Sequence, residues 1–439
     1  MGLAEKQPIN RRFVLGSVFL IANALIWYFT AATVLESAIE SVSTSPTQTL
    51  LMWSVHFGSL MLSLIIGAFL IKKIESKWFF TLWTIIGIVS PLFLLTLGFG
   101  QVWVAFLLSG LFGVSFGLGM PNCMELFTNV TDTKNRGRYS GLVMLLSGLG
   151  IAFFGLIDVT NIEMVILILI VWRLIGLVIL PFQKLPKEKV SNDVSFTSII
   201  NQRSFILYLI PWLMFSLVGY LGVPIQERIL GQSTINLLML IEAALMGIFA
   251  VISGHLLDIL GRKRVAMVGF ILMGVGYSVL GIYPFEMSSW FFYTVVDGVA
   301  WGIFYVIFVI SIWSDLSPNG RSGKYYAIGV LPFFISKFLQ IAIGKSVANI
   351  SEYALFSFIA FFLFLAVLPL VYAPETLPEK IMKERELKSY IAKAQKMVGK
   401  EQGKKEAEDK EAENSKEEQP AQENSEDYEK AKQLAEKYY

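Results

Sequence analysis

Apolar runs with the length of a membrane-spanning helix recur along the whole chain. A helix rises about 1.5 Å per residue, so crossing a hydrocarbon core of about 30 Å takes about 20 apolar residues. We therefore predict an all-α membrane protein with twelve transmembrane helices. The runs are 13–35, 48–71, 78–99, 102–127, 138–158, 162–182, 204–224, 234–257, 264–283, 288–313, 325–347 and 352–373.

Composition supports this class. The chain is 55% hydrophobic and only 16% charged, whereas soluble domains carry about 25% charged residues. The single cysteine, Cys123, excludes an intrachain disulfide and a cysteine-based metal site. We expect membrane lipids around the protein, and we expect no metal, no cofactor and no nucleic-acid partner.

Basic residues gather in alternate connections between the runs, which predicts the orientation of the chain. We expect both termini in the cytoplasm of a multi-pass protein of the cell membrane. Connections 129–137 and 258–264 are then cytoplasmic, and 36–47, 159–161 and 284–287 are extracellular. The cytoplasmic set is Lys72, Lys73, Lys77, Lys134, Arg136, Arg138, Arg262 to Arg264, Arg321 and Lys324, against Arg228 and Lys345 on the other side.

Charge and composition also divide the chain into four parts. We expect an N-terminal six-helix bundle at 1–182, a cytoplasmic linker at 183–203 and a C-terminal six-helix bundle at 204–373. Residues 374–439 are a charged cytoplasmic tail. Beyond Lys400 it has few apolar residues, so most of it is expected to be disordered.

The two bundles contain an internal repeat. The stretch from Gly67 to Lys77 occupies the same place in the first bundle as Gly254 to Arg264 in the second, and Gly137 matches Gly323 at nearly the same offset. This predicts two pseudo-symmetric bundles of like orientation. Ile71 replaces the acid in the first copy, so we expect only the second half to use that carboxylate.

The second copy, from Gly254 to Arg264, concentrates charge between two apolar runs. We predict a short loop at the membrane face, because Arg262 and Arg264 cannot remain in hydrocarbon. Gly254 and Gly261 would let the helix ends approach and turn sharply. The carboxylate of Asp258 could then reach a cation or the positive N-terminus of a neighbouring helix.

This G-x-x-x-D-x-x-G-R-K-R pattern resembles the signature loop of the major facilitator superfamily of secondary transporters. Residues 136–138 (R-G-R) resemble the family's connection between helices four and five. Residues 374–376 (P-E-T) resemble its sugar-porter-like members. The resemblance implies two bundles that rock about a central site for a small solute. Helix five lacks the G-P-x-x-G-G pattern of drug antiporters and helix four lacks an intramembrane arginine, so multidrug antiport is less expected.

No catalytic residues are predicted. Gly113-Val-Ser-Phe-Gly117 matches a serine-hydrolase elbow, but that elbow needs a strand-to-helix turn. Glycines of this stretch, like those of Gly298-Val-Ala-Trp-Gly302, are expected to permit close helix packing. The chain also lacks a Walker loop, which argues against an ATP-driven pump. We expect a transporter and not an enzyme.

Ionisable residues inside the runs are the candidate site, because each costs several kcal/mol unless it is paired or hydrated. Glu242, Asp297 and Lys337 fall at a similar depth of the second half. The resemblance implies that their helices line the cavity. We predict that they form one cluster and that at least one of the acids takes part in coupling to a proton or another ion. A buried structural ion pair is the alternative.

Five further polar or amphipathic groups are weaker candidates. Arg173 lies near the middle of the sixth run, where a structural role is favoured, while His56, Asn23, Trp27 and Tyr220 are each as readily packing residues. We conclude that the chain is a monomeric secondary transporter, a symporter in the simplest case. A transporter-like nutrient sensor that binds its ligand without moving it is the alternative.

Overall fold

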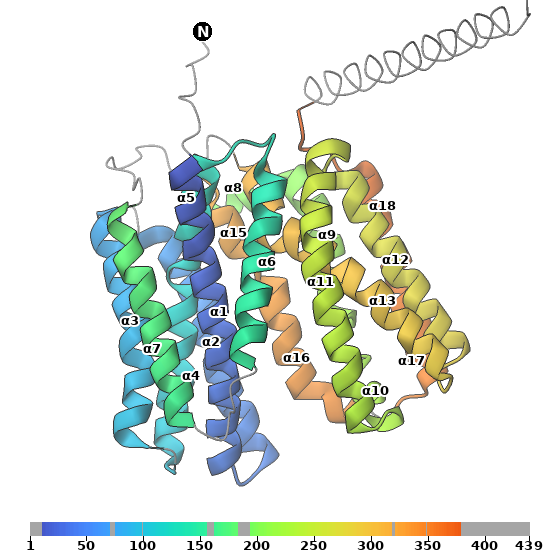
Figure 1. Ribbon diagram of the computed structural model, residues 1–439. Coiled ribbons are helices and arrows are strands. Elements are labelled where there is room, and N and C mark those ends of the chain that lie inside the picture. The colour runs from blue at the N-terminus through green and yellow to red at the C-terminus, as the bar shows by residue number, and fades with distance from the viewer. Residues whose placement is uncertain are drawn as a thin grey trace, which may run out of the picture. The chain divides into compact units, whose positions relative to one another are not determined.

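The computed structural model describes residues 11–70, 75–98, 100–155, 162–182, 194–317, 321–347 and 349–378, and every regular element within them is helical. Most of the long helices run side by side (Figure 1). The first half contains α1 (Arg11–Val42), α2 (Pro46–Leu70), α3 (Ser76–Leu97), α4 (Val102–Gly117), α5 (Met120–Val130), α6 (Arg136–Gly155), α7 (Ile162–Ile179) and the 3-10 helix η1 (Leu180–Phe182). The second half contains α8 (Phe196–Ile200), α9 (Arg203–Val218), α10 (Val223–Ile229), α11 (Gln232–Leu260), α12 (Arg262–Ile282), α13 (Met287–Phe304), the π-helical segment η2 (Tyr305–Ser311), α14 (Ile312–Leu316), α15 (Gly323–Gly329), α16 (Leu331–Val347), α17 (Glu352–Leu365) and α18 (Val367–Tyr372).

Eleven segments of the described chain are long and apolar enough to cross a membrane. Several join successive helices, as in Val102–Val130 and Met287–Leu316. They coincide with eleven of the predicted runs, which confirms the membrane class. The remaining run corresponds to α7, an 18-residue helix that packs against α3 and α1 but is not among the eleven.

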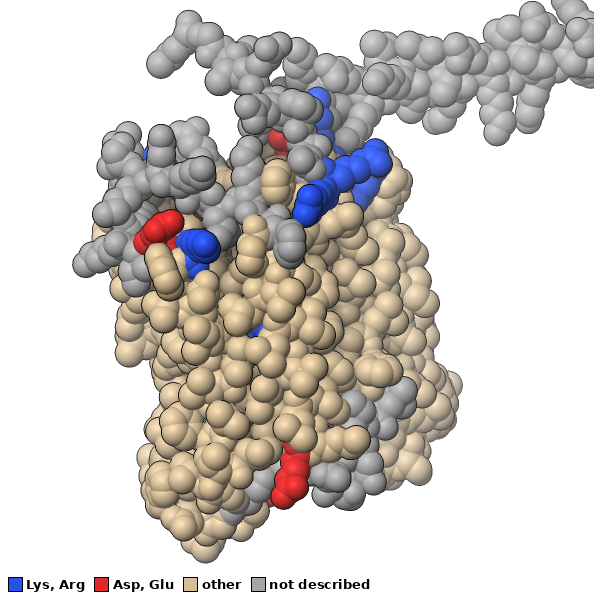
Figure 2. Space-filling model, turned by 60° about the vertical axis from the view of Figure 1, so that its left-hand side comes forward, with Lys and Arg blue, Asp and Glu red and all other residues tan. Residues whose placement is uncertain are grey.

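The outer surface of the helices is apolar. Leu240, Val178 and Phe153 are each more than 60% exposed. Soluble monomers rarely expose apolar patches of more than a few hundred Å², so this surface suits lipid. On the face shown in Figure 2, Lys and Arg residues lie near one end, next to a broad and mostly uncharged band.

The first helix is longer than predicted. It continues to Val42, whereas the sequence placed 36–47 in an extracellular connection. Ala38 and Ile39 are buried in its last turns, and this burial extends the helix past two acids. Glu36 and Glu40 therefore belong to a helix and not to a loop.

The predicted loop at 258–264 is also mostly helical. Asp258 lies within α11 and Arg262 already begins α12, so Gly261 alone separates the two helices. Leu257 is fully buried beside Asp258, which holds the last turn of α11 in place. Gly261 has φ of +93°, a conformation that favours glycine.

Contacts between the two halves follow the internal repeat. The main ones pair α6 with α11 and η2, and α2 with α15 and α16. Shifting α2 by 187 residues gives 233–257, the body of α11, and the same shift moves the start of α6 onto Gly323, the start of α15. The repeat therefore relates the contact between α6 and α11 to the contact between α2 and the helix that begins at Gly323. Two pseudo-symmetric halves are expected to show this relation.

Close packing by the two glycine pairs is confirmed. A Cβ at Gly298 would lie 2.9 Å from the carbonyl oxygen of Glu242, and one at Gly302 would lie 2.9 Å from that of Met246. Gly113 and Gly117 face α2 in the same way, where a Cβ would collide with the hydroxyls of Ser59 and Ser63.

All described residues belong to one compact unit that ends at Pro378. The expected boundaries at 182, 203 and 373 stay predictions. Several predicted segments lie outside the described residues: Lys72 and Lys73, 159–161, most of the linker (183–193) and the tail from 379.

Candidate functional site

A cavity of about 700 Å³ opens between the two halves. Its walls come from α1 and α2 of the first half and from α10, α11 and α16 of the second. These are the ends of α1, α10 and α16 that lie away from Asp258 (Figure 1). We call this the open end, and the end that carries the α5–α6 and α11–α12 connections the closed end.

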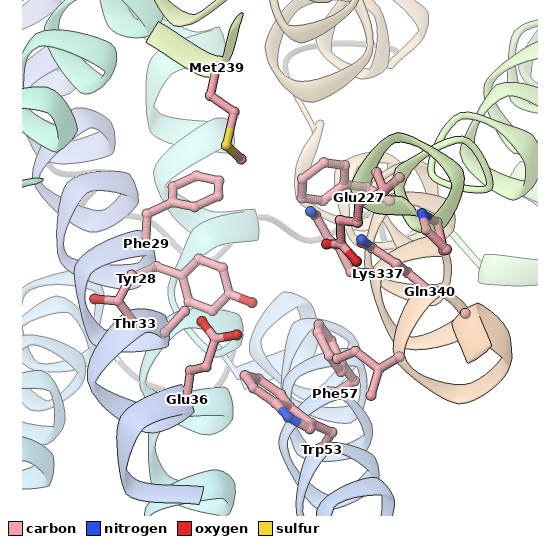
Figure 3. Close-up of a pocket in the computed structure, with 16 residues that line it drawn as sticks. Tyr28, Phe29, Thr33, Glu36, Trp53, Phe57, Glu227, Met239, Lys337 and Gln340 are labelled. Carbon is pink, nitrogen blue, oxygen red and sulfur yellow. The ribbon is translucent and has the colours of Figure 1, made fainter. Parts of the chain in front are cut away.

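Most of the wall is apolar and includes five aromatic side chains, with a few polar groups facing one another. Tyr28, Phe29, Trp53, Phe57 and Phe333 supply the rings. In Figure 3 Thr33 and Glu36 point inward from α1, while Lys337 and Gln340 approach from α16 on the opposite side, with Glu227 of α10 beside them. Such a lining suits a small solute with both apolar and polar parts.

Lys337 connects the cavity to a buried acid pair. Its ammonium lies 4.1 Å from the centre of the Tyr220 ring, a cation–π contact. Its charge also interacts with Glu242 of α11, and the side chain of Glu242 in turn interacts with that of Asp297 of α13. The structure therefore brings together the three ionisable groups that the sequence singled out.

Only one member of this cluster lines the cavity. Asp297 is 5% exposed, and its Oδ1 is buried without a hydrogen-bond partner among the described residues. A hydrogen bond between two carboxyl groups needs a donor, and a carboxylate can only accept. A proton on Glu242 or Asp297 would supply that donor.

Aromatic rings separate the cavity from the closed end. The ring of Tyr28 stacks on Phe116 of α4, with centroids 4.1 Å apart, and meets Phe334 of α16 edge-on at 6.1 Å. Phe116 and Phe334 also touch each other across the two halves, at 6.0 Å. A space of about 20 Å³ is left among these rings, roughly one water probe.

The closed end is sealed by Asp258. Its carboxylate accepts the backbone N–H groups of Gly137 at 2.9 Å and Arg138 at 3.1 Å, at the start of α6 in the other half. The side chains of Arg138 and Arg262 lie 3.6 and 3.5 Å away. Both partners expected for this carboxylate, a cation and a helix N-terminus, are thus present.

A second acid, Asp315 of α14, completes the seal. It forms ion pairs with Arg136 of the first half and, at 2.7 Å, with Arg262 of its own half. Arg262 also donates to the carbonyl oxygen of Thr133, 2.6 Å away in the α5–α6 connection. The side chain of Asp315 is fully buried between its two arginines.

Gly254 allows α11 to approach α6 closely. The sequence had instead predicted a close approach between the helices on either side of the loop, α11 and α12. A Cβ on Gly254 would lie 2.5 Å from the carbonyl oxygen of Gly137, and a Cβ on Gly141 would lie 2.6 Å from that of Ala250. The hydrogen bonds of Asp258 depend on this close approach, because any side chain here would separate the helices.

The P-E-T stretch has a structural use. Glu375 accepts the backbone N–H groups of Arg262 at 2.8 Å and Lys263 at 3.1 Å, and so caps the first turn of α12. A Cβ on Gly261 would collide with this carboxylate. Gly261 is therefore required both for its positive φ and for the space above it.

One expectation was wrong. The sequence assigned the carboxylate contact to the second half only, because Ile71 replaces the acid in the first copy. In the structure, Glu125 of α5 accepts the backbone N–H of Gly323 at 3.1 Å, at the start of α15. Gly323 is the repeat partner of Gly137, so each half supplies a carboxylate to the other, but from different helices.

Arg173 and Asn23 lie away from the cavity, within the first half. The guanidinium of Arg173 donates to Asn23 Oδ1 at 3.1 Å and lies 4.0 Å from the centre of the Trp83 ring. Asn23 also donates to the carbonyl oxygen of Trp172 at 2.7 Å. These contacts join α1, α3 and α7, which supports the structural role favoured for Arg173.

Two other candidates are placed differently. His56 is buried beneath the cavity wall, with ring nitrogens 3.3 Å from the Tyr28 hydroxyl and 3.1 Å from the carbonyl oxygen of Ser109. Arg264 is exposed on α12. Neither is among the residues that line the cavity.

Sequence reasoning missed the acids at element ends. Glu36 was assigned to a loop, while Glu125, Glu227 and Asp315 were not singled out. An acid next to a predicted helix end is usually solvated, so its position in the sequence does not indicate a functional role. Glu36 and Glu40 are four residues apart, a helical spacing that could have indicated that the first helix continues past Glu36.

Among the described residues, no group of three or more His, Cys, Asp or Glu side chains is arranged to hold a metal ion. The open cavity, the acid pair behind it and the sealed opposite end are therefore the features to compare with known proteins.

Residues 194–403 match the model of the Major Facilitator Superfamily. The fold is similar to that of the human organic anion transporter MFSD10 (TETRAN), with a TM-score of 0.62 and 14% identity over 83% of this chain and all of that one. It is also similar to the proton:xylose symporter XylE bound to 6-bromo-6-deoxy-D-glucose, with a TM-score of 0.63 and 15% identity over 84% of this chain and 97% of that one.

A comparison with curated proteins found no match. At 14 and 15% identity the structural likeness shows the fold and not the substrate. The family match over residues 194–403, the fold of the chain and the signature residues at the closed end agree with one another, and they identify the Major Facilitator Superfamily of transporters as the family that this chain resembles.

Proposed function

We propose that this protein is a secondary active transporter that moves a small solute by alternating access. One observation carries the proposal: the two halves are sealed together at one end by Asp258, Asp315 and their partners, while a cavity of about 700 Å³ separates them at the other. Opening the sealed end and closing the other would carry a bound solute across.

In this proposal α7 is the twelfth transmembrane helix and the two six-helix bundles rock about the cavity. Both termini are cytoplasmic in the cell membrane, because the basic residues concentrate at the closed end. The cavity of the present structure then faces outward. The protein works as a monomer, without a cofactor or catalytic residues.

Coupling is assigned to the buried acid pair. Glu242 and Asp297 share a proton, and Lys337 lies between this pair and the solute cavity. A solute that displaces the ammonium of Lys337 would change the charge next to the pair, and so its proton content. This makes proton symport the simplest mechanism for the site.

The test separates transport from sensing. A thermal-shift screen of purified protein against sugars, organic acids, amino acids and amines identifies a ligand, because a ligand that binds only the folded state raises its stability. Radiolabelled ligand is then exchanged across proteoliposome membranes. A transporter accelerates exchange by counterflow, whereas a sensor binds the ligand saturably without exchange.

A further inference from the structure

The charges in the cavity are unevenly compensated. Among the lining residues that the structure describes, two are acids, Glu36 and Glu227, and one, Lys337, is a cation. Lys337 is already held in its own half by the Tyr220 ring and by Glu242, which acts on it more strongly than Glu36 does. The lining therefore has an excess of negative charge on the side of the first half.

The neighbours of these acids do not remove that excess. Glu40, one turn further along α1, places a second carboxylate beside Glu36, while the charge of Lys337 acts on Glu36 from the other half. Next to Glu227, the side chain of Arg228 is engaged in an ion pair with Glu352. The open end of the cavity thus presents a negative potential, which attracts cations and repels anions.

The wall beside Glu36 is aromatic. Phe29 lies two turns before Glu36 on the same side of α1, and both point into the cavity in Figure 3. Across from them, Trp53 and Phe57 of α2 stack on each other with centroids 5.7 Å apart. Ring faces attract organic cations by about 0.5–2 kcal/mol and also accept apolar groups.

A bare metal ion does not fit this lining. Hard cations such as Ca²⁺ take six to eight oxygen ligands, whereas the cavity wall is mostly aromatic and aliphatic side chains, with two carboxylates on opposite sides. Its volume of about 700 Å³ lies within the range of pockets that hold organic ligands, about 300–1,000 Å³.

We propose that the cavity selects an amphipathic organic cation, with a protonated amine at Glu36 and an apolar group against Phe29, Trp53 and Phe57. This proposal rests on the transport function and adds the chemical class of the solute. An anion would have to take Lys337 from Glu242 and would lie beside two like charges. A neutral solute would leave Glu36 without a partner.

Four probes of one skeleton test the charge requirement: 4-phenylbutylamine, 4-phenylbutanol, 4-phenylbutyrate and homophenylalanine. Binding to the purified full-length protein is measured by thermal shift and equilibrium dialysis at fixed ionic strength. The amine should bind at least about tenfold more tightly than the alcohol, the acid or the zwitterion, the change expected from one charge-assisted contact.

Glu36→Gln should weaken binding of the amine by about tenfold and leave the weak binding of the alcohol unchanged. Glu36 is exposed in the cavity, so this variant should fold. Glu163→Gln, which removes an exposed acid of α7 outside the cavity lining, is the matched control and should bind the amine like the native protein.

Equal or tighter binding of the acid, the alcohol or the zwitterion would overturn the proposal, as would amine binding that is absent or indifferent to Glu36→Gln. These outcomes are equilibrium measurements and do not depend on transport. Amine binding through Glu36 without exchange in proteoliposomes would instead contradict the transport function and leave the ligand class standing.

Discussion

The carboxylate of Asp258 in the second half accepts the backbone N–H of Gly137 in the first half at 2.9 Å. Neither residue could make this contact if α6 and α11 carried ordinary side chains here, since a Cβ on Gly137 would lie 2.5 Å from the carbonyl oxygen of Gly254. The seal therefore depends on the charge of Asp258 and on having a glycine on each half, at 137 and at 254.

The close approach itself can be tested with Gly254→Ala. The added methyl group must move α6 away from α11, so we expect a lower melting temperature and increased maleimide labelling of a cysteine that replaces Ser140, a buried residue of α6, in a Cys123→Ser background. Gly247→Ala is the control on the same helix, because a Cβ there meets nothing within 4 Å.

Alanine is a better helix former than glycine by about 1 kcal/mol, so the control should be neutral or slightly stabilising. Equal effects of the two substitutions would mean that the helices do not depend on contact at Gly254.

The orientation of the chain is testable by single-cysteine labelling. If basic residues mark the cytoplasmic side, a cysteine at Thr44 in intact cells should react with an impermeant maleimide, and one at Thr133 should react only after permeabilisation. Both are placed in a Cys123→Ser background. The reverse pattern would place the open end inside the cell.

The shared proton of Glu242 and Asp297 should be visible by infrared spectroscopy. We expect the carbonyl stretch of a protonated carboxylic acid in the native protein, and its loss in Glu242→Gln, which leaves Asp297 without a second acid to share a proton with. In transport, both Glu242→Gln and Asp297→Asn should lose uphill accumulation but keep exchange.

Breaking a buried ion pair costs about 3–5 kcal/mol, so a purely structural cluster would show another pattern. Glu242→Gln and Asp297→Asn would then each lose stability in proportion to their loss of activity. Removing Lys337 together with Asp297 would restore much of the lost stability. Native accumulation by both acid variants would exclude them from coupling.

Asn23 and Arg173 should behave as one structural unit. Asn23→Leu removes the acceptor of a buried guanidinium, and a buried charged group left without its partner costs about 3 kcal/mol or more. The double variant Asn23→Leu with Arg173→Met buries apolar groups instead and should recover most of the melting temperature. Additive losses would show that the two residues act independently.

Much of the fold could be predicted from the sequence, because a lipid-facing helix must be apolar over its whole length. Helix ends were harder. The run ending at 35 is followed by Glu36, yet α1 continues to Val42 because Ala38 and Ile39 still find buried contacts. Such contacts come from distant helices and leave no local pattern.

The site was predicted only in part for a related reason. Glu242, Asp297 and Lys337 were visible because charge inside a long apolar run is rare. Glu125 was not, although its contact with Gly323 corresponds to that of Asp258 with Gly137. In both halves of the repeat a carboxylate binds the same helix N-terminus, but the carboxylate comes from a different helix in each. Comparing positions one repeat apart in the sequence therefore cannot find Glu125.

The central claim, that the two ends open alternately, is tested most directly by measuring both ends in one protein. Spin labels at Glu75 and Arg264 report the closed end, and labels at Thr44 and Ser351 report the open end, in a Cys123→Ser background. The native protein should show a short distance for the first pair and a long distance for the second.

Asp258→Asn removes a charge that accepts two hydrogen bonds, each worth about 1.5–3 kcal/mol when the group is charged, so the populations should shift by about tenfold or more. We predict that the Glu75–Arg264 distance lengthens and the Thr44–Ser351 distance shortens in the same fraction of molecules, while Glu286→Gln changes neither. Lengthening at the closed end without shortening at the open end would contradict alternating access.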